Sequence, residues 1–298
     1  MQRERLMRRM FPKKAVKMIK AVDIDKLFDK YIEKYVYENI GKIKPEEIED
    51  SMPVMFNRFG GEKTAELGGK SPREYYLGHT AEELLACLKE HIETGVPVSD
   101  FLCEAITGDG QNAPALSAAL YGEESEEFTA YLMNMLSDMG AEIPVARYME
   151  FVLEDYPENI GELATEALAS AAERSAAVRD AAVAAYEGAA EAGKARLAEI
   201  LSHAKGDKRA LSVLTAEFSA HPENVPLYAG YLARFGDERA LPLLYEAIER
   251  EGLTYADFEE LRFAIEALGG SYDKERDFSA DRTYKKIKGA SRRRRQNR

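Results

Sequence analysis

The stretch GGEKTAELGGKSPREYY, residues 60–76, contains residue types that could bind a phosphate group. A nucleotide-binding loop of this kind needs glycine, four residues of any type and then Gly-Lys-Ser/Thr, so that backbone N–H groups and the lysine surround the phosphates. If Gly69, Lys70 and Ser71 end such a loop, its first glycine must be residue 64, which is threonine. No apolar strand precedes the stretch, so the sequence argues against a nucleotide site.

The same residues have the order expected at the start of a helix. Ser71 can act as the N-cap, Pro72 then occupies the first helical position, and Glu74 can bond back to the cap. Thr80 and Glu83 repeat the cap and its partner a few residues later. We therefore interpret this stretch as a loop followed by two capped helices.

Histidine and carboxylate residues offer little further chemistry. None of the histidines stands at the spacing of a zinc-binding motif, and the surroundings of His91, KEHIE, predict an exposed helix edge. Acidic runs such as residues 45–50 and 122–127 are typical of solvated helix starts, where glutamate complements the helix dipole. No Gly-x-Ser-x-Gly nucleophile motif is present. The sequence predicts no catalytic residue, no metal and no cofactor, and hence a protein that is not an enzyme.

Cysteine usage and hydropathy bear on location. Only Cys87 and Cys103 are present, too few for a disulfide framework, and the leucines around Cys87 predict that it packs as a small apolar residue. No apolar run approaches the ~20 residues that span a bilayer, and residues 1–20 lack the apolar core of a secretory signal. The sequence predicts a soluble, cytoplasmic protein without a transmembrane segment.

Tyrosine is the residue type whose use points to a binding surface. The chain has 16 tyrosines and no tryptophan. Tyrosine is favoured where a surface is apolar on one side and wet on the other, as in binding grooves. On this interpretation the candidate binding residues are Tyr228, Tyr231, Tyr245 and Tyr255. The alternative is that these rings fill the space between helices and leave only their hydroxyls at the rim.

The net charge of −12 is distributed unevenly. Residues 1–20 carry +7 and residues 274–298 carry +8, which leaves −27 on residues 21–273. Nucleic-acid binding needs clustered positive charge, so the acidic body instead favours a basic partner. The second basic segment has the composition of a disordered tail. It can bind nucleic acid, an acidic membrane or the acidic body itself through the run Arg292, Arg293, Arg294 and Arg295.

Apolar residues recur at helical spacing through most of the chain. Between residues 125 and 139 they stand at successive positions of one helix face: Phe128, Tyr131, Leu132, Met135, Leu136 and Met139. Glycine and proline interrupt such patterns at short intervals, which is the rhythm of antiparallel helix pairs. Strict two-residue alternation is not found, so the sequence predicts an all-α protein.

Two internal repeats indicate how the helices are arranged. GDKRALSVL at 206–214 returns as GDERALPLL at 236–244, 30 residues later. YPENIGELATEAL at 156–168 is similar to HPENVPLYAGYLA at 221–233, 65 residues later. In each copy of the first repeat, glycine can end one helix and the aspartate that follows can cap the next. A two-helix unit cannot bury its apolar face alone, so such units must stack.

These segments, together with RSAAVRDAAVAA at 174–185, resemble HEAT-type helical repeats, in particular the short ones named after phycobilisome lyases. The resemblance covers residues 155–270 best and continues in degenerate form back to residue 80. The Pro-x-Asn steps and several tyrosines are also similar to tetratricopeptide repeats, although the 30-residue spacing departs from their 34-residue period. Either family implies an α-solenoid, and neither fixes a function.

The expected organisation has four parts. They are a basic segment over residues 1–20, a helical region over 21–79, a HEAT-like α-solenoid of stacked antiparallel helix pairs over 80–270, and a basic, disordered tail over 271–298. A solenoid without catalytic motifs predicts a scaffold that binds a protein or peptide. The alternatives are a nucleic-acid-associated protein that uses its basic ends and, by repeat-family analogy alone, an enzyme with lyase-like activity.

Deletion of residues 285–298 tests the nucleic-acid alternative. The deletion removes eight basic residues and no acidic one, so binding through this tail would weaken and depend less steeply on salt. We expect the scaffold outcome, in which the intact chain binds neither labelled RNA nor labelled DNA at low salt. Binding that the deletion abolishes would favour the nucleic-acid alternative instead.

Overall fold

The computed structural model describes residues 19–39, 45–122 and 125–287. Within these residues the regular secondary structure is helical, apart from one isolated antiparallel bridge between Thr64 and Lys70. The all-α prediction is therefore confirmed for this part of the chain. None of the helices described there is long and apolar enough to cross a membrane.

The chain forms two compact units, Met1–Ile143 and Pro144–Arg298, which we call the N-terminal and C-terminal units and describe separately. The boundaries expected from the sequence, after residues 20, 79 and 270, stay predictions. Most of the first basic segment and the final part of the second lie outside the described residues.

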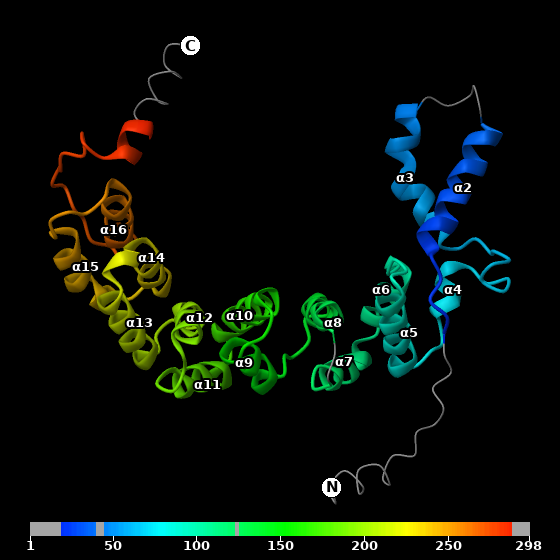
Figure 1. Ribbon diagram of the computed structural model, residues 1–298, viewed down its shortest axis with the longest axis horizontal. Coiled ribbons are helices and arrows are strands. Elements are labelled where there is room, and N and C mark those ends of the chain that lie inside the picture. Colours follow the sequence, from blue (N-terminus) through cyan, green and yellow to red (C-terminus); the bar gives the residue numbers. More distant parts are fainter. Residues whose placement is uncertain (1–18, 40–44, 123–124, 288–298) are drawn as a thin grey trace, which may run out of the picture. The chain divides into compact units, whose positions relative to one another are not determined.

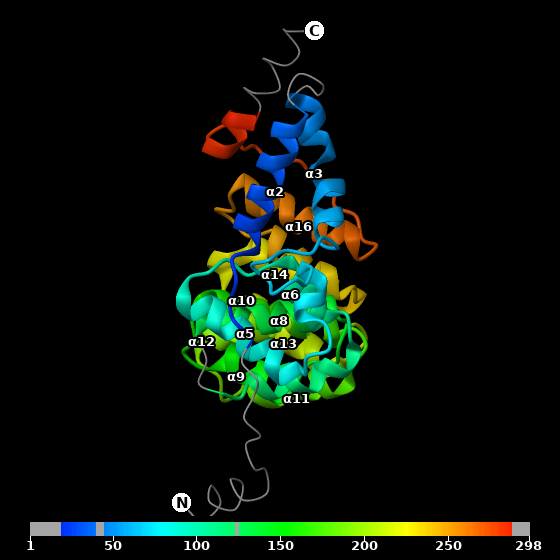
Figure 2. The same cartoon turned by 90° about the vertical axis from the view of Figure 1, so that its right-hand side faces the viewer.

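The N-terminal unit is built from short helices. They are α2 (Ile24–Glu38), α3 (Pro45–Phe59), α4 (Pro72–Tyr76), α5 (Ala81–Thr94), α6 (Asp100–Thr107), the 3-10 helix η1 (Gly110–Asn112), α7 (Ala113–Ala119) and α8 (Glu126–Asp138). α2 and α3 lie side by side as a hairpin (Figures 1 and 2). Phe56 of α3 joins this hairpin to α6, because its ring centroid lies 5.0 Å from Phe28 and 4.8 Å from Phe101.

The glycine-rich loop and the helix starts after it are confirmed. The Ser71 hydroxyl accepts the Glu74 N–H at 3.2 Å, and the Glu74 carboxylate accepts the Ser71 N–H at 3.0 Å. Thr80 and Glu83 form the same reciprocal pair at the start of α5. Gly69 has a φ of 80°, a left-handed conformation that a side chain would strain. This glycine therefore serves the turn that leads into the first cap.

His91, expected at an exposed helix edge, is in fact buried. Helix α5 ends at Thr94, Gly95 caps it, and the chain then turns back beside the imidazole. Nδ1 of His91 lies 2.8 Å from the carbonyl oxygen of Pro97 and 3.2 Å from that of Val96. The expectation was wrong because the groups that bond this histidine belong to the turn after the helix, which helical periodicity does not describe.

Cys87 is confirmed as a packing residue. It is 1% exposed, and burial, followed by the charge of the nearby Glu90, raises the pKa of its thiol to about 12. A thiol with this pKa is almost fully protonated at neutral pH and is therefore a poor nucleophile.

The C-terminal unit arranges its helices in two rows. They are α9 (Val145–Leu153), α10 (Glu158–Ala172), α11 (Ala176–Tyr186), α12 (Glu191–Ser202), α13 (Lys208–Ala220), η2 (Pro222–Asn224), α14 (Val225–Phe235), η3 (Glu238–Ala240), α15 (Leu241–Ile248) and α16 (Tyr255–Ala267). α10, α12, α14 and α16 pack each on the next and form the even row (Figure 1). α9, α11, α13 and α15 form the odd row, and each of them packs against the even helix that follows it.

The first internal repeat marks equivalent places in the odd row. Asp207 accepts the N–H of Arg209 at 2.9 Å at the start of α13. Asp237 accepts the N–H of Arg239 at 3.0 Å just before α15. Both predicted caps are thereby confirmed. The second copy begins with η3 because Pro242, which replaces a serine of the first copy, has no N–H to close an α-helical turn.

The second internal repeat marks equivalent places in the even row. Its two Pro-Glu-Asn sequences lie at the starts of α10 and α14, with α11, α12 and α13 between these helices. The 65-residue repeat thus spans two helix pairs, and the 30-residue repeat spans one. The two spacings in the sequence therefore describe the same alternation of rows.

Residues 271–287, which the sequence assigns to a disordered tail, pack on the end of the C-terminal unit, and we call them the strap (Figure 1). Phe278 is 8% exposed, and its ring centroid lies 5.1 Å from that of Phe258 and 5.4 Å from that of Tyr255. The composition of this segment is polar and basic, so its few aromatic anchors do not stand out in the sequence.

Polar bonds also hold the strap at the helix ends. Arg276 donates to the carbonyl oxygens of Ile248 and Arg250 at 3.0 and 2.7 Å, which satisfies acceptors left open at the end of α15. Asp281 accepts the N–H of Tyr255 at 3.2 Å at the start of α16. The strap therefore caps both helices of the last pair.

We expect Ser71→Ala to lower the free energy of unfolding by about 0.5–2 kcal/mol, because the Glu74 N–H loses its acceptor at a buried cap. Urea denaturation followed by circular dichroism measures the change. Lys70→Ala, at the exposed neighbouring position, is the control and should change stability by less than about 0.5 kcal/mol. Equal unfolding midpoints for the two variants would contradict the cap.

We expect Phe278→Ala to destabilise the C-terminal unit by about 3 kcal/mol, because a buried aromatic ring is removed from the end of the helix rows. Phe263→Ala removes the same ring from a position that is 62% exposed and is the matched control, with an expected change within about 0.5 kcal/mol. Thermal and urea unfolding compare the two. A strap that did not pack would leave both variants as stable as the parent protein.

Candidate functional site

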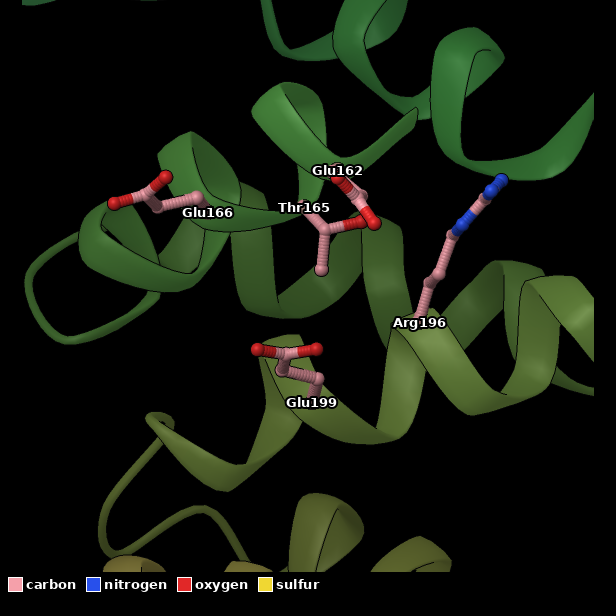
Figure 3. A pocket seen from close by; sticks show the side chains of 5 residues that line it. All are labelled: Glu162, Thr165, Glu166, Arg196 and Glu199. Atoms are coloured by element: carbon pink, nitrogen blue, oxygen red, sulfur yellow. The ribbon is translucent and has the colours of Figure 1, made fainter. Parts of the chain in front are cut away.

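A cleft of about 450 Å³ opens between α10 and α12 in the C-terminal unit. Its lining is mostly acidic: Glu162, Thr165 and Glu166 come from α10, and Arg196 and Glu199 come from α12 (Figure 3). Both helices belong to the even row. We call the side of this row that faces away from the odd row the open face.

The glutamates of α10 stand on the open face because of the helix repeat. Glu162 and Glu166 are four residues apart, so they lie one turn from each other, and both are exposed. Ala164 and Leu168 occupy the other side of the helix and are fully buried. The same helix thus packs with one side and presents carboxylates with the other.

Arg196 crosses from α12 toward the start of α10. Its Nη1 donates to the carbonyl oxygen of Val152 at 3.3 Å. The guanidinium passes directly over Gly161, where a Cβ atom would lie 2.7 Å from Cζ of Arg196. The hydroxyl of Thr165 is also engaged, since it donates to the carbonyl oxygen of Gly161 at 2.7 Å. Glycine at this position is therefore what lets the arginine lie along α10.

Glu199 faces the α10 side chains from the other wall, and in Figure 3 its carboxylate lies across the space from Thr165. The hydroxyl of Tyr231 on α14 lies 3.5 Å from Oε2 of Glu199. Burial, and then the charge of Glu199, raise the pKa of Tyr231 well above its ordinary value. The hydroxyl therefore stays protonated and can donate to the carboxylate.

The charges of the cleft define what it can hold. The lining holds three carboxylates and one guanidinium, and that guanidinium already donates to a backbone carbonyl. Negative charge in a partly enclosed space attracts cations, and carboxylates form their strongest hydrogen bonds with charged donors. The arrangement can therefore bind an ammonium or guanidinium group. Over the described part of the chain, no group of histidine, cysteine and acidic side chains converges as a metal site would require.

Two of the tyrosines predicted as binding residues lie inside the helix packing. Tyr228 and Tyr231 are 3% and 7% exposed, and their rings meet edge to face at 5.8 Å. Tyr228 also stacks on His221 at 5.3 Å, and burial raises its pKa to about 12. These rings fill the space between helices, as in the alternative interpretation of the sequence. Tyr231 reaches the cleft through its hydroxyl, which lies 3.5 Å from Oε2 of Glu199.

The other predicted residues lie away from the cleft. Tyr245 donates its hydroxyl to the carbonyl oxygen of Ser271 at 3.1 Å and accepts the Ser271 N–H at 3.2 Å. Tyr255 packs against Phe278 and Tyr284. Both tyrosines therefore hold the strap. The four arginines at residues 292–295 lie outside the described residues.

The sequence prediction missed the residues of the cleft. One local signal was present, because Glu158, Glu162 and Glu166 follow one another at every fourth position of α10. No local signal in the sequence indicates that Glu162 and Glu166 lie close to Arg196 and Glu199, because this proximity depends on how one helix pair packs on the next.

Comparison with known proteins finds no matching family model, no matching curated protein and no matching solved structure. Function is therefore inferred from the cleft and its charges.

Proposed function

We propose that this chain is a non-enzymatic scaffold whose open face binds a basic segment of a partner protein. The observation that carries the proposal is the cleft between α10 and α12, where Glu162, Glu166 and Glu199 surround an open space. A lysine or arginine side chain that enters this space exchanges water for charge-assisted hydrogen bonds, which contribute about 1.5–3 kcal/mol each.

We further propose that the C-terminal unit is an α-solenoid of HEAT-like repeats. Two observations support this: even-row helices pack each on the next, and the two sequence repeats fall on equivalent helices one and two pairs apart. In a solenoid each repeat contacts its neighbours along the row, so one face stays free over several repeats. Such a face suits an extended partner segment.

The charge of the acidic body of the chain supports the choice of a basic partner. Residues 21–273 carry −27, and a potential of this sign attracts basic segments and speeds their association. Salt limits the attraction to about 8 Å at physiological ionic strength. Discrimination among basic partners therefore depends on direct contacts, which the cleft supplies.

The alternatives have less support. The residues on which nucleic-acid binding depends lie mostly in 1–18 and 288–298, outside the described residues, so that alternative stays a prediction. Lyase-like activity has only the repeat resemblance behind it.

We expect a triple variant, Glu162→Gln, Glu166→Gln and Glu199→Gln, to bind a labelled Lys/Arg-rich peptide at least about tenfold more weakly than the parent protein. Losing one charged hydrogen bond already costs about this factor. Fluorescence anisotropy at several salt concentrations measures the affinity, and circular dichroism checks that the helices are retained.

The matched control removes the same charge from exposed glutamates that are associated with the odd row. It combines Glu187→Gln, Glu246→Gln and Glu251→Gln, and we expect it to weaken binding less than about twofold, since distant surface charges are largely screened. Equal losses of affinity in the two triple variants would mean that peptide binding depends on the overall charge of the protein. The cleft would then no longer support the proposal.

A further inference from the structure

Two large apolar side chains are exposed on α14 and α16, the two helices of the even row that follow the acidic cleft. Leu227 on α14 is 45% exposed and Phe263 on α16 is 62% exposed. These two helices pack directly on each other. Among the described residues of the odd row, no large apolar side chain is exposed to this degree. The asymmetry between the rows distinguishes these side chains from the scattered apolar residues of an ordinary surface.

Leu227 lies on the side of α14 that borders the cleft. Leu227, Tyr231 and Arg234 stand at positions i, i+4 and i+7 and therefore share one stripe of the helix. Tyr231 reaches Glu199 of α12 through its hydroxyl, and Arg234 donates to the Ser202 hydroxyl of α12 at 3.1 Å. The stripe that carries Leu227 thus adjoins the α12 wall of the cleft.

Phe263 lies on the side of α16 that faces away from the odd row. Ile265 marks the opposite side, because a Cβ atom at Gly270 would lie 2.9 Å from both Ile265 and Leu241 of α15. Two residues along a helix correspond to a rotation of about 200°. Phe263 therefore points away from α15, onto the open face.

We propose that Leu227 and Phe263 form the apolar half of a docking surface whose acidic half is the cleft between α10 and α12. The occupant is a segment of a partner protein that carries lysine or arginine at one end and large apolar side chains at the other. This inference rests on the proposed function and adds an apolar contact to the binding of the basic group. Buried apolar anchors usually supply most of the affinity of such contacts, while charges set orientation and selectivity.

The order of the helices in the even row gives an approximate spacing of the two halves. Packed helices lie about 8–10 Å apart, so two steps along the even row separate the cleft from the α14–α16 pair by about 16–20 Å. An extended segment covers this distance with about five or six residues. A helical segment needs about 11–13 residues.

Charge favours this occupant over a second copy of the chain. Phe263 stands beside Glu260 and Glu266, while Glu259 pairs with Arg262, so apposing two copies of this face would bring the two remaining glutamates of each copy together. The same glutamates complement a partner segment that also carries basic residues around its apolar anchor.

The experiment selects random peptides of about 16 residues, long enough for the extended span, from a phage library on the full-length protein. We expect enriched peptides that combine basic and large apolar residues at the extended spacing. A synthetic copy of one is then titrated against two double variants. Leu227→Ala with Phe263→Ala should weaken binding about tenfold or more. Val54→Ala with Leu77→Ala, at exposed apolar positions of the N-terminal unit, should leave it unchanged.

The outcomes separate the two proposals. If the Leu227/Phe263 variant binds like the parent protein while the cleft triple variant loses binding, the apolar half is wrong and the proposal of a scaffold that binds a basic segment stands. If the cleft triple variant binds like the parent, or if no peptide is enriched, the proposed function fails and this inference fails with it.

Discussion

The helix pairs of the C-terminal unit pack each on the next, and this stacking determines both the core of the unit and its free surface. Ala164, Leu168 and Ala172 of α10 and Leu197 and Ala198 of α12 are fully buried, and the small alanines let the two helices approach closely. Along the even row, each helix contacts its neighbours through its packed side, and the strap covers the end of the last pair. On α10 the buried residues lie opposite Glu162 and Glu166, so the side that carries these glutamates stays free.

The features that the sequence predicted well are those fixed over a few residues. The caps at Ser71, Thr80, Asp207 and Asp237 depend on a side-chain oxygen and an N–H two or three residues away, so residue types and spacing suffice. Helical periodicity likewise indicated the all-α class. The two repeat spacings carried information about the order of rows, because each copy of a repeat begins the same kind of helix.

The features that the sequence did not predict depend on contacts between distant segments. His91 is bonded by a turn outside its helix, and the strap is held by Arg276 and Phe278 against helices that precede it in the chain. Tyr228 and Tyr231 are of a residue type that is common in binding grooves, but both are buried in the core. The cleft has the same origin, because its two walls come from separate helix pairs whose packing no local motif encodes.

Glu162 and Glu166 of the cleft stand one turn apart on α10 and carry the same charge. Glu191 pairs with Lys194 at 3.2 Å, and Arg262 with Glu259 at 2.7 Å, each within a single turn. Glu162 instead has Glu166 one turn away, and like charges at this spacing cost a helix roughly 0.2–0.5 kcal/mol. The cost is small enough for the packing of α10 to offset. A cation bound between α10 and α12 would relieve this repulsion and that of Glu199 together, so the local disadvantage becomes a source of affinity for a basic partner.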